Sequence, residues 1–216
     1  MTRPSKQTIT AVVLAGGRGT RMGGVDKGLQ LFNGIPLAQY ALQRLQLQAS
    51  SVVINANRNL ADYESFGVPI WPDDNTLGEF AGPLAGVLTA LQRCETPFLL
   101  TVPCDAPLFP ADLAKRLSLA LTQQQADIAV ASAPESNESD DASEHGKACR
   151  PQPVFSLMKV AVLPSLLTYM QAGGRKVSTW MAQHRVALAP FNLRGDAPHA
   201  FFNANTPAEL QQSQTI

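Results

Sequence analysis

A glycine-rich segment with three cationic side chains lies close to the start of the chain. Residues 14–28 read LAGGRGTRMGGVDKG, which contains six glycines together with Arg18, Arg21 and Lys27. Glycine lets the backbone approach a ligand closely and turn its N–H groups toward an anion. The cations supply the matching positive charge, so the segment favours a polyphosphate ligand over a neutral one. A plain glycine turn is the alternative, but it does not explain the cations.

Two familiar phosphate-binding patterns do not fit this segment. The dinucleotide-binding fingerprint would need glycine at position 22, where the chain has Met22. A P-loop would need lysine directly after its last glycine, but Val25 follows Gly24. The segment is therefore predicted to wrap a nucleotide as a long loop, and Met22 also disfavours a dehydrogenase.

Other polar residues stand where predicted strands end. Asp105 follows an apolar run, and it is either a ligand-binding carboxylate or a turn residue that accepts backbone N–H groups. Asn55 offers a donor and an acceptor to a base or ribose, or it is an ordinary loop residue. Of Asp73 and Asp74, one could hold a nucleotide or metal while the other caps a turn.

The elements that position these residues alternate along the chain. Apolar, β-branched runs predict strands at Ile9–Ala15, Ser51–Ala56, Val68–Trp71, Phe98–Val102, Asp127–Ala131, Pro153–Met158 and Val186–Ala189. Helical spacing of apolar residues predicts helices at Pro36–Leu47, Asn59–Phe66, Pro83–Leu91, Pro110–Leu121, Val160–Met170, Lys176–Gln183 and Pro207–Gln214. This order predicts a single-domain α/β, Rossmann-like fold, with a mostly parallel sheet and helices on both faces. In such sheets ligands bind beyond the carboxyl ends of the strands.

We expect residues 1–8 to be a flexible N-terminus and residues 9–216 to form one domain. Within it, residues 133–147 (APESNESDDASEHGK) are acidic and almost devoid of apolar side chains. Such a segment has little to bury, so it is predicted to be a mobile surface insertion. A metal-binding loop is the alternative, but the Asp/Asn/Gly spacing of a calcium loop is absent.

The composition excludes several classes of protein. The 216 residues are 45% hydrophobic, which is typical of a globular domain. Seventeen basic residues balance seventeen acidic ones, so no excess of positive charge favours nucleic acid. The longest apolar run, Ala11–Ala15, is too short for a membrane span, and we expect a cytoplasmic protein. Three widely spaced cysteines are expected to be reduced thiols, and the three histidines form no zinc pattern.

The sequence LAGGRGTRMGGVDKGL resembles the signature loop of nucleotidyltransferases that join an NTP to a phosphorylated acceptor and release pyrophosphate. Further matching motifs are INANR at 54–58, PDD at 72–74, GPLAG at 82–86, VPCDAP at 102–107 and FFNANTPAEL at 201–210. The whole set, from Ile9 to Leu210, is most similar to the molybdenum cofactor guanylyltransferases. The long acidic stretch departs from that pattern, and it is interpreted as a loop insertion.

The resemblance implies transfer of GMP from GTP to the terminal phosphate of molybdenum-molybdopterin, with Mg²⁺ as the cofactor. It implies that Asp105 is the metal ligand and that Arg21 and Lys27 stabilise charge on the triphosphate. The nucleotide-binding residues carried over from the family are Leu14, Ala15, Gly16, Gly17, Lys27, Asn55, Asp73 and Asp105.

Five residues are weaker candidates for binding the acceptor: Gly82, Arg175, Lys176, Asn203 and Asn205. Gly82 opens a predicted helix whose N–H groups face the site, or it only caps that helix. The basic pair at 175–176 could bind the acceptor phosphate or be solvated at a helix end. The resemblance places the asparagines beside the pterin or metal, although Asn205 is also a good helix start.

Two other functions remain as alternatives. A sister transferase could use CTP, or a sugar phosphate or another small phosphorylated acceptor, with the same loop chemistry. A regulatory module could bind the nucleotide without turnover, although the presence of both Lys27 and Asp105 argues against it. The expected partners are GTP and a molybdopterin-type cofactor, together with cofactor-biosynthesis proteins and recipient molybdoenzymes. We expect a monomer or a weak homo-oligomer that binds neither nucleic acid nor membrane.

Overall fold

A computed structural model describes residues 3–17, 24–74, 82–134, 149–197 and 199–203. Its main sheet has six strands in the order β4-β1-β5-β7-β6-β8, and a small ribbon pairs β2 with β3. The strands are β1 (Ile9–Leu14), β2 (Leu31–Phe32), β3 (Ile35–Pro36), β4 (Ser51–Asn55), β5 (Phe98–Pro103), β6 (Ile128–Pro134), β7 (Cys149–Lys159) and β8 (Val186–Pro190). In the main sheet β7 runs antiparallel to both of its neighbours, and the other pairs are parallel.

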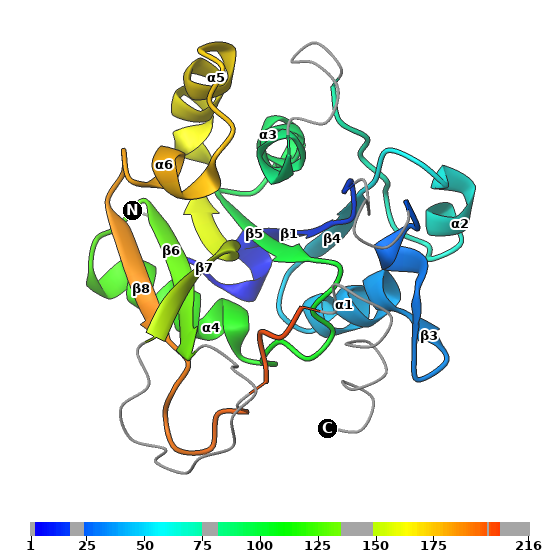
Figure 1. Ribbon diagram of the computed structural model, residues 1–216. Helices are drawn as coiled ribbons and strands as arrows, with labels where there is room; N and C mark the ends of the chain where they lie inside the picture. Colours follow the sequence, from blue (N-terminus) through cyan, green and yellow to red (C-terminus); the bar gives the residue numbers. More distant parts are fainter. Residues whose placement is uncertain (1–2, 18–23, 75–81, 135–148, 198, 204–216) are drawn as a thin grey trace.

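Helices cover both faces of this sheet (Figure 1). They are α1 (Leu37–Gln46), α2 (Leu60–Glu64), α3 (Pro83–Arg93), α4 (Leu113–Gln123), α5 (Leu163–Gln171) and α6 (Val177–Met181), with 3-10 turns η1 (Lys6–Thr8), η3 (Lys27–Leu29) and η5 (Val160–Val162). One face packs against α1 and α4, and the other packs against α3, α5 and α6. The predicted α/β architecture is confirmed. No helix in the described ranges is long and apolar enough to cross a membrane.

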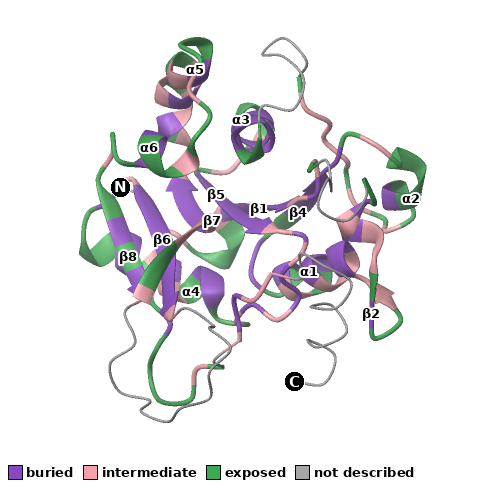
Figure 2. Cartoon of the chain, in the orientation of Figure 1, coloured by how far each residue is buried: buried purple, intermediate pink, exposed green. Residues whose placement is uncertain are grey.

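The central strands are buried on both sides, as their unbroken apolar runs predict (Figure 2). Along β1, Ala11 and Val13 enter the core on the α1 and α4 side, whereas Val12 enters the core beneath α3. The two cores hold the sheet from both faces and leave the ends of its strands free to present polar groups.

Strand β7 carries a bulge at the edge where β5 ends. Ser156 of β7 pairs with Val130 of β6, but the next residue of β6 pairs with Gln152. Residues 153–155 therefore have no partner on β6. The hydroxyl of Thr101 on β5 donates to the carbonyl of Val154 at 2.6 Å and fixes the bulge. Because β7 is antiparallel, its first half reaches the carboxyl end of β5.

Several predicted elements differ in the structure. Strand β7 begins at Cys149 rather than at Pro153, and Ala133 and Pro134 belong to β6 rather than to the acidic insertion, because the β6–β7 pairing extends to Pro134 and Cys149.

The strand predicted at Val68–Trp71 is a single bridge between Ile54 and Ile70, because Pro69 within it and Pro72 after it supply no N–H donor. The helix predicted from Pro110 begins at Leu113, after a turn closed by the Leu113 N–H on the Pro110 carbonyl.

The helix predicted at Val160–Met170 is divided. It starts as the 3-10 turn η5 and becomes α-helical at Leu163, where Pro164 occupies the first turn. The predicted helix at 207–214 and residues 135–148 of the acidic stretch lie outside the described residues.

Candidate active site

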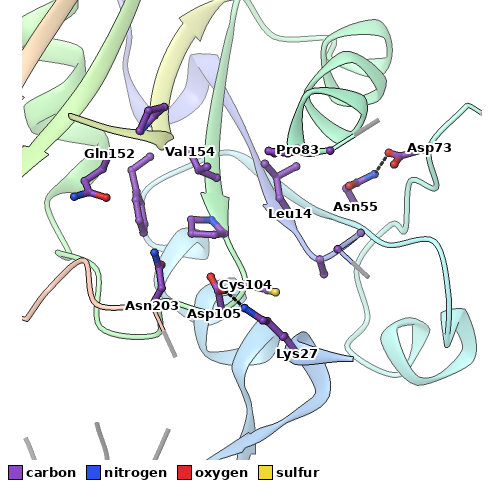
Figure 3. Close-up of a pocket in the computed structure, with 17 residues that line it drawn as sticks. Leu14, Lys27, Asn55, Asp73, Pro83, Cys104, Asp105, Gln152, Val154 and Asn203 are labelled. Carbon is purple, nitrogen blue, oxygen red and sulfur yellow. Dashed lines mark hydrogen bonds and ion pairs between the residues drawn. The ribbon is translucent and has the colours of Figure 1, made fainter. Parts of the chain in front are cut away.

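A cavity of about 770 Å³ opens where β1, β4 and β5 end and β7 begins (Figure 3). This is the sheet edge at which an α/β fold of this kind binds ligands. Its walls are formed by Leu14, Ala15, Gly16, Gly17, Lys27, Asn55, Asp73, Gly82, Pro83, Pro103, Cys104, Asp105, Gln152, Pro153, Val154, Phe155 and Asn203. The cavity therefore joins residues from both halves of the sequence.

Asn55 and Asp73 form one side of the cavity. Asn55 is 2% exposed, and its Nδ2 donates to the carbonyl of Trp71 at 2.8 Å and to Oδ1 of Asp73 at 2.7 Å. Asn57 holds Asp73 in turn, because its Nδ2 donates to Oδ2 at 2.8 Å and its Oδ1 accepts from the Asp73 N–H at 2.7 Å. The Asp73 carboxylate is thus fixed as an acceptor, while the exposed Asp74 is not part of the wall.

Helix α3 packs closely against Asn55 on this side of the cavity, because Gly86 at the contact has no side chain. A Cβ on Gly86 would lie 2.2 Å from Oδ1 of Asn55 and 2.8 Å from Cδ2 of Leu14. Only glycine therefore fits at this contact. The helix begins after Gly82, whose φ of 71° is in the region that glycine favours. Gly82 and Pro83 both line the cavity, so the N-terminal end of α3 faces it.

Lys27 and Asp105 meet across the cavity floor. The Lys27 ammonium lies 3.1 Å from Oδ2 of Asp105, and the two side chains are 19% and 16% exposed. Figure 3 shows them pointing toward one another, with Asn55 and Asp73 on one side and Gln152 and Asn203 on the other. The cation is suited to an anionic ligand and the carboxylate to a hard cation, so the pair can act on a metal-bound polyphosphate.

The donor set around Asp105 fits Mg²⁺ bound jointly with a substrate. Magnesium is usually held by one or two carboxylates, while waters and substrate phosphates complete its octahedron. Within the described ranges no three His, Cys, Asp or Glu side chains form a metal-binding group. Asp105 would therefore hold the ion together with nucleotide phosphates. The neighbouring Cys104 is buried, and burial raises the pKa of its thiol.

Known proteins match this chain over nearly its whole length. Residues 11–187 match the MobA-like NTP transferase domain. A molybdenum cofactor guanylyltransferase of Acidovorax sp. (strain JS42) is 61% identical over 202 residues, which cover 94% of this chain and 93% of that protein. The chain belongs to the molybdenum cofactor guanylyltransferase family. Another member, from Bordetella pertussis, is 50% identical over 210 residues, 97% of this chain and 98% of that protein.

Solved structures share the fold of this guanylyltransferase at low identity. Molybdopterin-guanine dinucleotide biosynthesis protein A from Archaeoglobus fulgidus superposes with a TM-score of 0.72 at 19% identity, over 95% of this chain and 97% of that one. A CMP:2-keto-3-deoxy-manno-octonic acid synthetase in complex with CTP superposes with a TM-score of 0.69 at 13% identity, over 98% of each chain. These two likenesses establish the architecture alone.

The structure brings most of the predicted site residues of this guanylyltransferase together. The expected nucleotide-binding residues all line the cavity, namely Leu14, Ala15, Gly16, Gly17, Lys27, Asn55, Asp73 and Asp105. Of the weaker acceptor candidates, Gly82 and Asn203 line it as well. Arg18, Arg21 and Asn205 lie outside the described residues.

Arg175 and Lys176 are not in the cavity wall. Arg175 donates to the carbonyls of Met170 at 2.9 Å and Gly174 at 2.8 Å, so it caps the C-terminal end of α5. The Lys176 carbonyl accepts from the hydroxyl of Tyr169 at 3.2 Å. Arg175 thus lies at a helix end, as the alternative interpretation expects, and neither residue of the pair lines this cavity.

Several residues of the site were not predicted from the sequence. Asn57 and Arg58 stand in the INANR motif, where the spacing directly after Asn55 was a usable signal. No signal in the sequence pointed to the wall at Gln152–Phe155. These residues are mostly apolar, and the bulge of β7 brings them to the cavity.

Proposed function

We propose that this chain transfers the GMP moiety of GTP to the terminal phosphate of molybdopterin carrying molybdenum. The products are the guanine dinucleotide form of the cofactor and pyrophosphate. The observation that carries the proposal is the Lys27–Asp105 pair, which shares one cavity with the fixed Asp73 carboxylate. Sequence identity of 61% and 50%, over nearly the full length, to proteins named molybdenum cofactor guanylyltransferase supports the same activity.

The reaction needs positioning and charge neutralisation more than proton transfer. An oxygen of the acceptor's phosphate monoester attacks the α-phosphorus of GTP. The bond from that phosphorus to the β-bridging oxygen breaks, and pyrophosphate leaves with the electron pair. The attacking oxygen is already anionic at neutral pH, so no general base is required.

The positive charge of Lys27 would stabilise the negative charge that accumulates on the leaving group, and Asp105 would be the ligand of the metal ion. Mg²⁺ bound to Asp105 would neutralise phosphate oxygens and act as a Lewis acid. Asp105 also keeps the ammonium of Lys27 directed into the cavity before a nucleotide arrives.

The Asp73 side of the cavity suits a guanine base. Guanine carries adjacent N–H donors on its ring and amino group, and an ionised carboxylate only accepts hydrogen bonds. Hydrogen bonds from Asn55 and Asn57 fix the orientation of the Asp73 carboxylate. Cytosine offers a donor beside an acceptor, which matches a carboxylate less well. We therefore assign this side to the base of GTP.

The opposite wall, Gln152–Phe155 with Asn203, is assigned to the acceptor. It lies across the Lys27–Asp105 pair from Asp73 (Figure 3). The wall combines apolar side chains with two amides, which suits a flat heterocycle with polar edges such as a pterin.

Release of pyrophosphate tests this function directly. The purified protein is incubated with Mg²⁺ and with GTP, CTP, ATP or UTP, each with and without molybdenum-loaded molybdopterin. We expect release with GTP only when the acceptor is present. Equal or faster release with CTP would instead support a sister transferase, and nucleotide binding with no release would support a regulatory module.

A further inference from the structure

Arg58 joins two separate stretches of backbone beside the candidate active site. Its Nη1 donates to the carbonyl of Gly24 at 2.6 Å. Its Nη2 donates to the carbonyl of Gly17 at 3.2 Å and to that of Val25 at 3.0 Å. Gly17 follows β1 and lines the cavity, whereas Gly24 and Val25 lead into Lys27. One planar guanidinium therefore ties Gly17 to Gly24 and Val25 within the glycine-rich segment.

The same guanidinium faces a buried carboxylate. Nε of Arg58 lies 3.6 Å from Oδ2 of Asp26, whose side chain is only 5% exposed. Asp26 also accepts from Asn59 Nδ2 at 3.0 Å, from the Tyr63 hydroxyl at 2.6 Å and from the Gly28 N–H at 3.2 Å. A charge this deeply buried is stable because each oxygen has donors around it.

Tyr63 acts as a fixed donor in this cluster. Its ring is fully buried, and burial raises the pKa of its hydroxyl well above the usual range, with the nearby Cys104 and Asp26 adding to the effect. The hydroxyl lies 2.3 Å from the position that a Cβ on Gly28 would take, so the backbone passes directly against it. The backbone on both sides of Lys27 is thus held, at Asp26 and at Gly28.

We propose that Arg58 is a positioning residue for nucleotidyl transfer, which directs Lys27 toward Asp105 by tying Gly17 to Gly24 and Val25. This inference rests on the proposed function. Arginine is suited to the task because its rigid fork donates in several directions at once, which a lysine ammonium on a flexible stem does not reproduce. Arg58 follows Asn55 and Asn57 in the chain, so one short segment sets both the base side and the phosphate side of the cavity.

A surface arginine often contributes little to the free energy of folding, since an exposed ion pair is screened by solvent. Arg58 is 35% exposed, but its short contacts go to three main-chain carbonyls rather than to a mobile side chain. Its loss would leave those carbonyls to water and release the backbone that carries Lys27. The effect is therefore expected in turnover more than in nucleotide affinity.

Kinetics of Arg58→Ala, Arg58→Lys and Lys27→Ala form the first test. We expect Arg58→Ala to lower kcat for pyrophosphate release by about 10- to 100-fold, which is the scale of a misplaced catalytic group. The Kd for GTP should change by less than about 5-fold, and Arg58→Lys should recover little activity. Guanidinium ion at about 20 mM should restore part of the turnover of Arg58→Ala, whereas methylammonium should not.

A double-mutant cycle tests whether Arg58 acts through Lys27. Lys27→Ala alone should lower kcat by roughly 100-fold, as for other lost charge stabilisers. Adding Arg58→Ala to it should lower kcat by less than about 2-fold further, because residues that act as a unit are not additive. Additive effects of the two substitutions would overturn the proposal.

Arg116→Ala is the matched control. Arg116 also bonds a main-chain carbonyl, that of Pro190, and a carboxylate, that of Asp196 at 2.6 Å, but it lies outside the cavity wall. Its substitution should lower Tm and leave kcat unchanged.

Hydrogen exchange supplies a readout that does not depend on turnover. The N–H groups of Gly28, Leu29 and Gln30 are bonded within the Asp26–Lys27 turn. Their exchange should be faster in Arg58→Ala than in the wild-type protein, and unchanged in Arg116→Ala. Unaltered exchange in Arg58→Ala would overturn the proposal. If the wild-type protein released no pyrophosphate, that result would contradict the proposed function alone.

Discussion

At the scale of single residues, the missing side chain of Gly86 is what lets helix α3 lie against Asn55. The contact leaves no room for a methyl group, since two atoms of Asn55 and one of Leu14 would lie within 3 Å of it. Asn55 in turn holds Asp73. A glycine in the helix thus determines where an acceptor for the nucleotide base lies.

Gly86→Ala is therefore expected to displace Asn55 and to weaken GTP binding by about 10-fold or more, since about 1.4 kcal/mol changes affinity by that factor. Calorimetric titration with GTP measures the change. Val87→Ala is the control, because it makes a cavity in the same helix and should lower Tm without altering GTP affinity. Unchanged affinity in Gly86→Ala would show that Asn55 does not set the base side.

The second prediction at this scale concerns Asp105. Asp105→Asn should lose most Mg²⁺-dependent turnover while the protein stays folded, because an amide is a poor substitute for a charged hard ligand. Turnover is measured against Mg²⁺ concentration, and circular dichroism checks the fold. Activity close to wild type at limiting Mg²⁺ would show that Asp105 is a turn residue and not the metal ligand.

The sequence predicted residues whose chemistry is visible in their type, and it missed those whose role depends on placement. Asn55, Asp73 and Asp105 are polar residues near predicted strand ends, and Lys27 is a cation in a glycine-rich segment; all four line the cavity. The INANR motif includes Arg58, but its contacts with Gly24 and Gly17 join positions 34 and 41 residues apart, so the motif could not predict its partners.

At the scale of elements, the bulge in β7 is held by one hydroxyl. Thr101 is 1% exposed, and its Oγ1 donates to the Val154 carbonyl at 2.6 Å and lies 3.0 Å from the Ser156 hydroxyl. Val154 lines the cavity on the side assigned to the acceptor. The conformation of the bulge therefore shapes that wall.

Thr101→Val keeps the shape of the side chain but removes the donor. We expect a KM for molybdopterin about 5-fold higher, a GTP affinity within about 2-fold of wild type, and a loss of about 1–2 kcal/mol in the free energy of unfolding. Steady-state kinetics with each substrate varied and urea unfolding measure these effects. Thr122→Val, which removes a similar hydroxyl-to-carbonyl bond on the exposed side of helix α4, is the control. A change in GTP affinity alone would contradict our assignment of the two walls.

The ends of three strands meet at Asp127. Its carboxylate accepts from Lys159 Nζ at 3.1 Å and from Arg185 Nη2 at 3.2 Å, which links the start of β6 to the end of β7 and the start of β8. The hydrogen bonds from Arg185 and then Lys159 lower the pKa of Asp127 to about 2. The ordinary value in an unfolded chain is about 3.9.

Because the folded state lowers this pKa, the stabilisation is complete above about pH 4 and is lost as the pH falls toward 2. Asp127→Asn should reduce the free energy of unfolding by about 1 kcal/mol at pH 7, a figure that allows for solvent screening. Urea unfolding between pH 7 and pH 3 should show the difference from wild type becoming smaller below pH 4. Asp112→Asn, at a more exposed carboxylate, should have little effect at any pH. A difference that did not vary with pH would contradict the prediction.

The sequence was reliable for elements whose pattern is local. The buried runs at β1, β4 and β5 and the amphipathic helices α1 and α3 lie within a few residues of their predicted bounds. The direction of β7 and its bulge could not be predicted, because both depend on pairing with β5 and β6 at distant positions.

At the scale of the whole molecule, the acidic connection begins and ends at one place. Pro134 and Cys149 face each other in the β6–β7 ladder, so the sheet itself joins the ends of segment 135–148, which lies outside the described residues. The closing entropy of a loop depends only weakly on its length. Its composition also offers little to bury.

Replacing residues 135–148 with a short Gly/Ser linker should leave Tm within about 3 °C and pyrophosphate release within about 2-fold of wild type. Thermal unfolding and steady-state kinetics measure both. A variant with the same residues in shuffled order keeps length and charge and is the control. A large loss of activity in the linker variant but not in the shuffled one would show that the acidic charge itself contributes.

The division of the cavity along the chain has a consequence for how this enzyme class diversifies. Every cavity residue on the side that we assign to the nucleotide lies at or before Asp105, and the wall that we assign to the acceptor comes entirely from residues 152–155 and 203. Genetic recombination at a point after Asp105 would therefore exchange one substrate while inheriting the other intact. The antiparallel β7 contributes to this division, because it lies between β5 and β6 and its first half forms one wall of the cavity beside the carboxyl end of β5. On the proposed assignment of the two walls, replacement of the second half of the gene would change the acceptor and retain the phosphate chemistry of the first half.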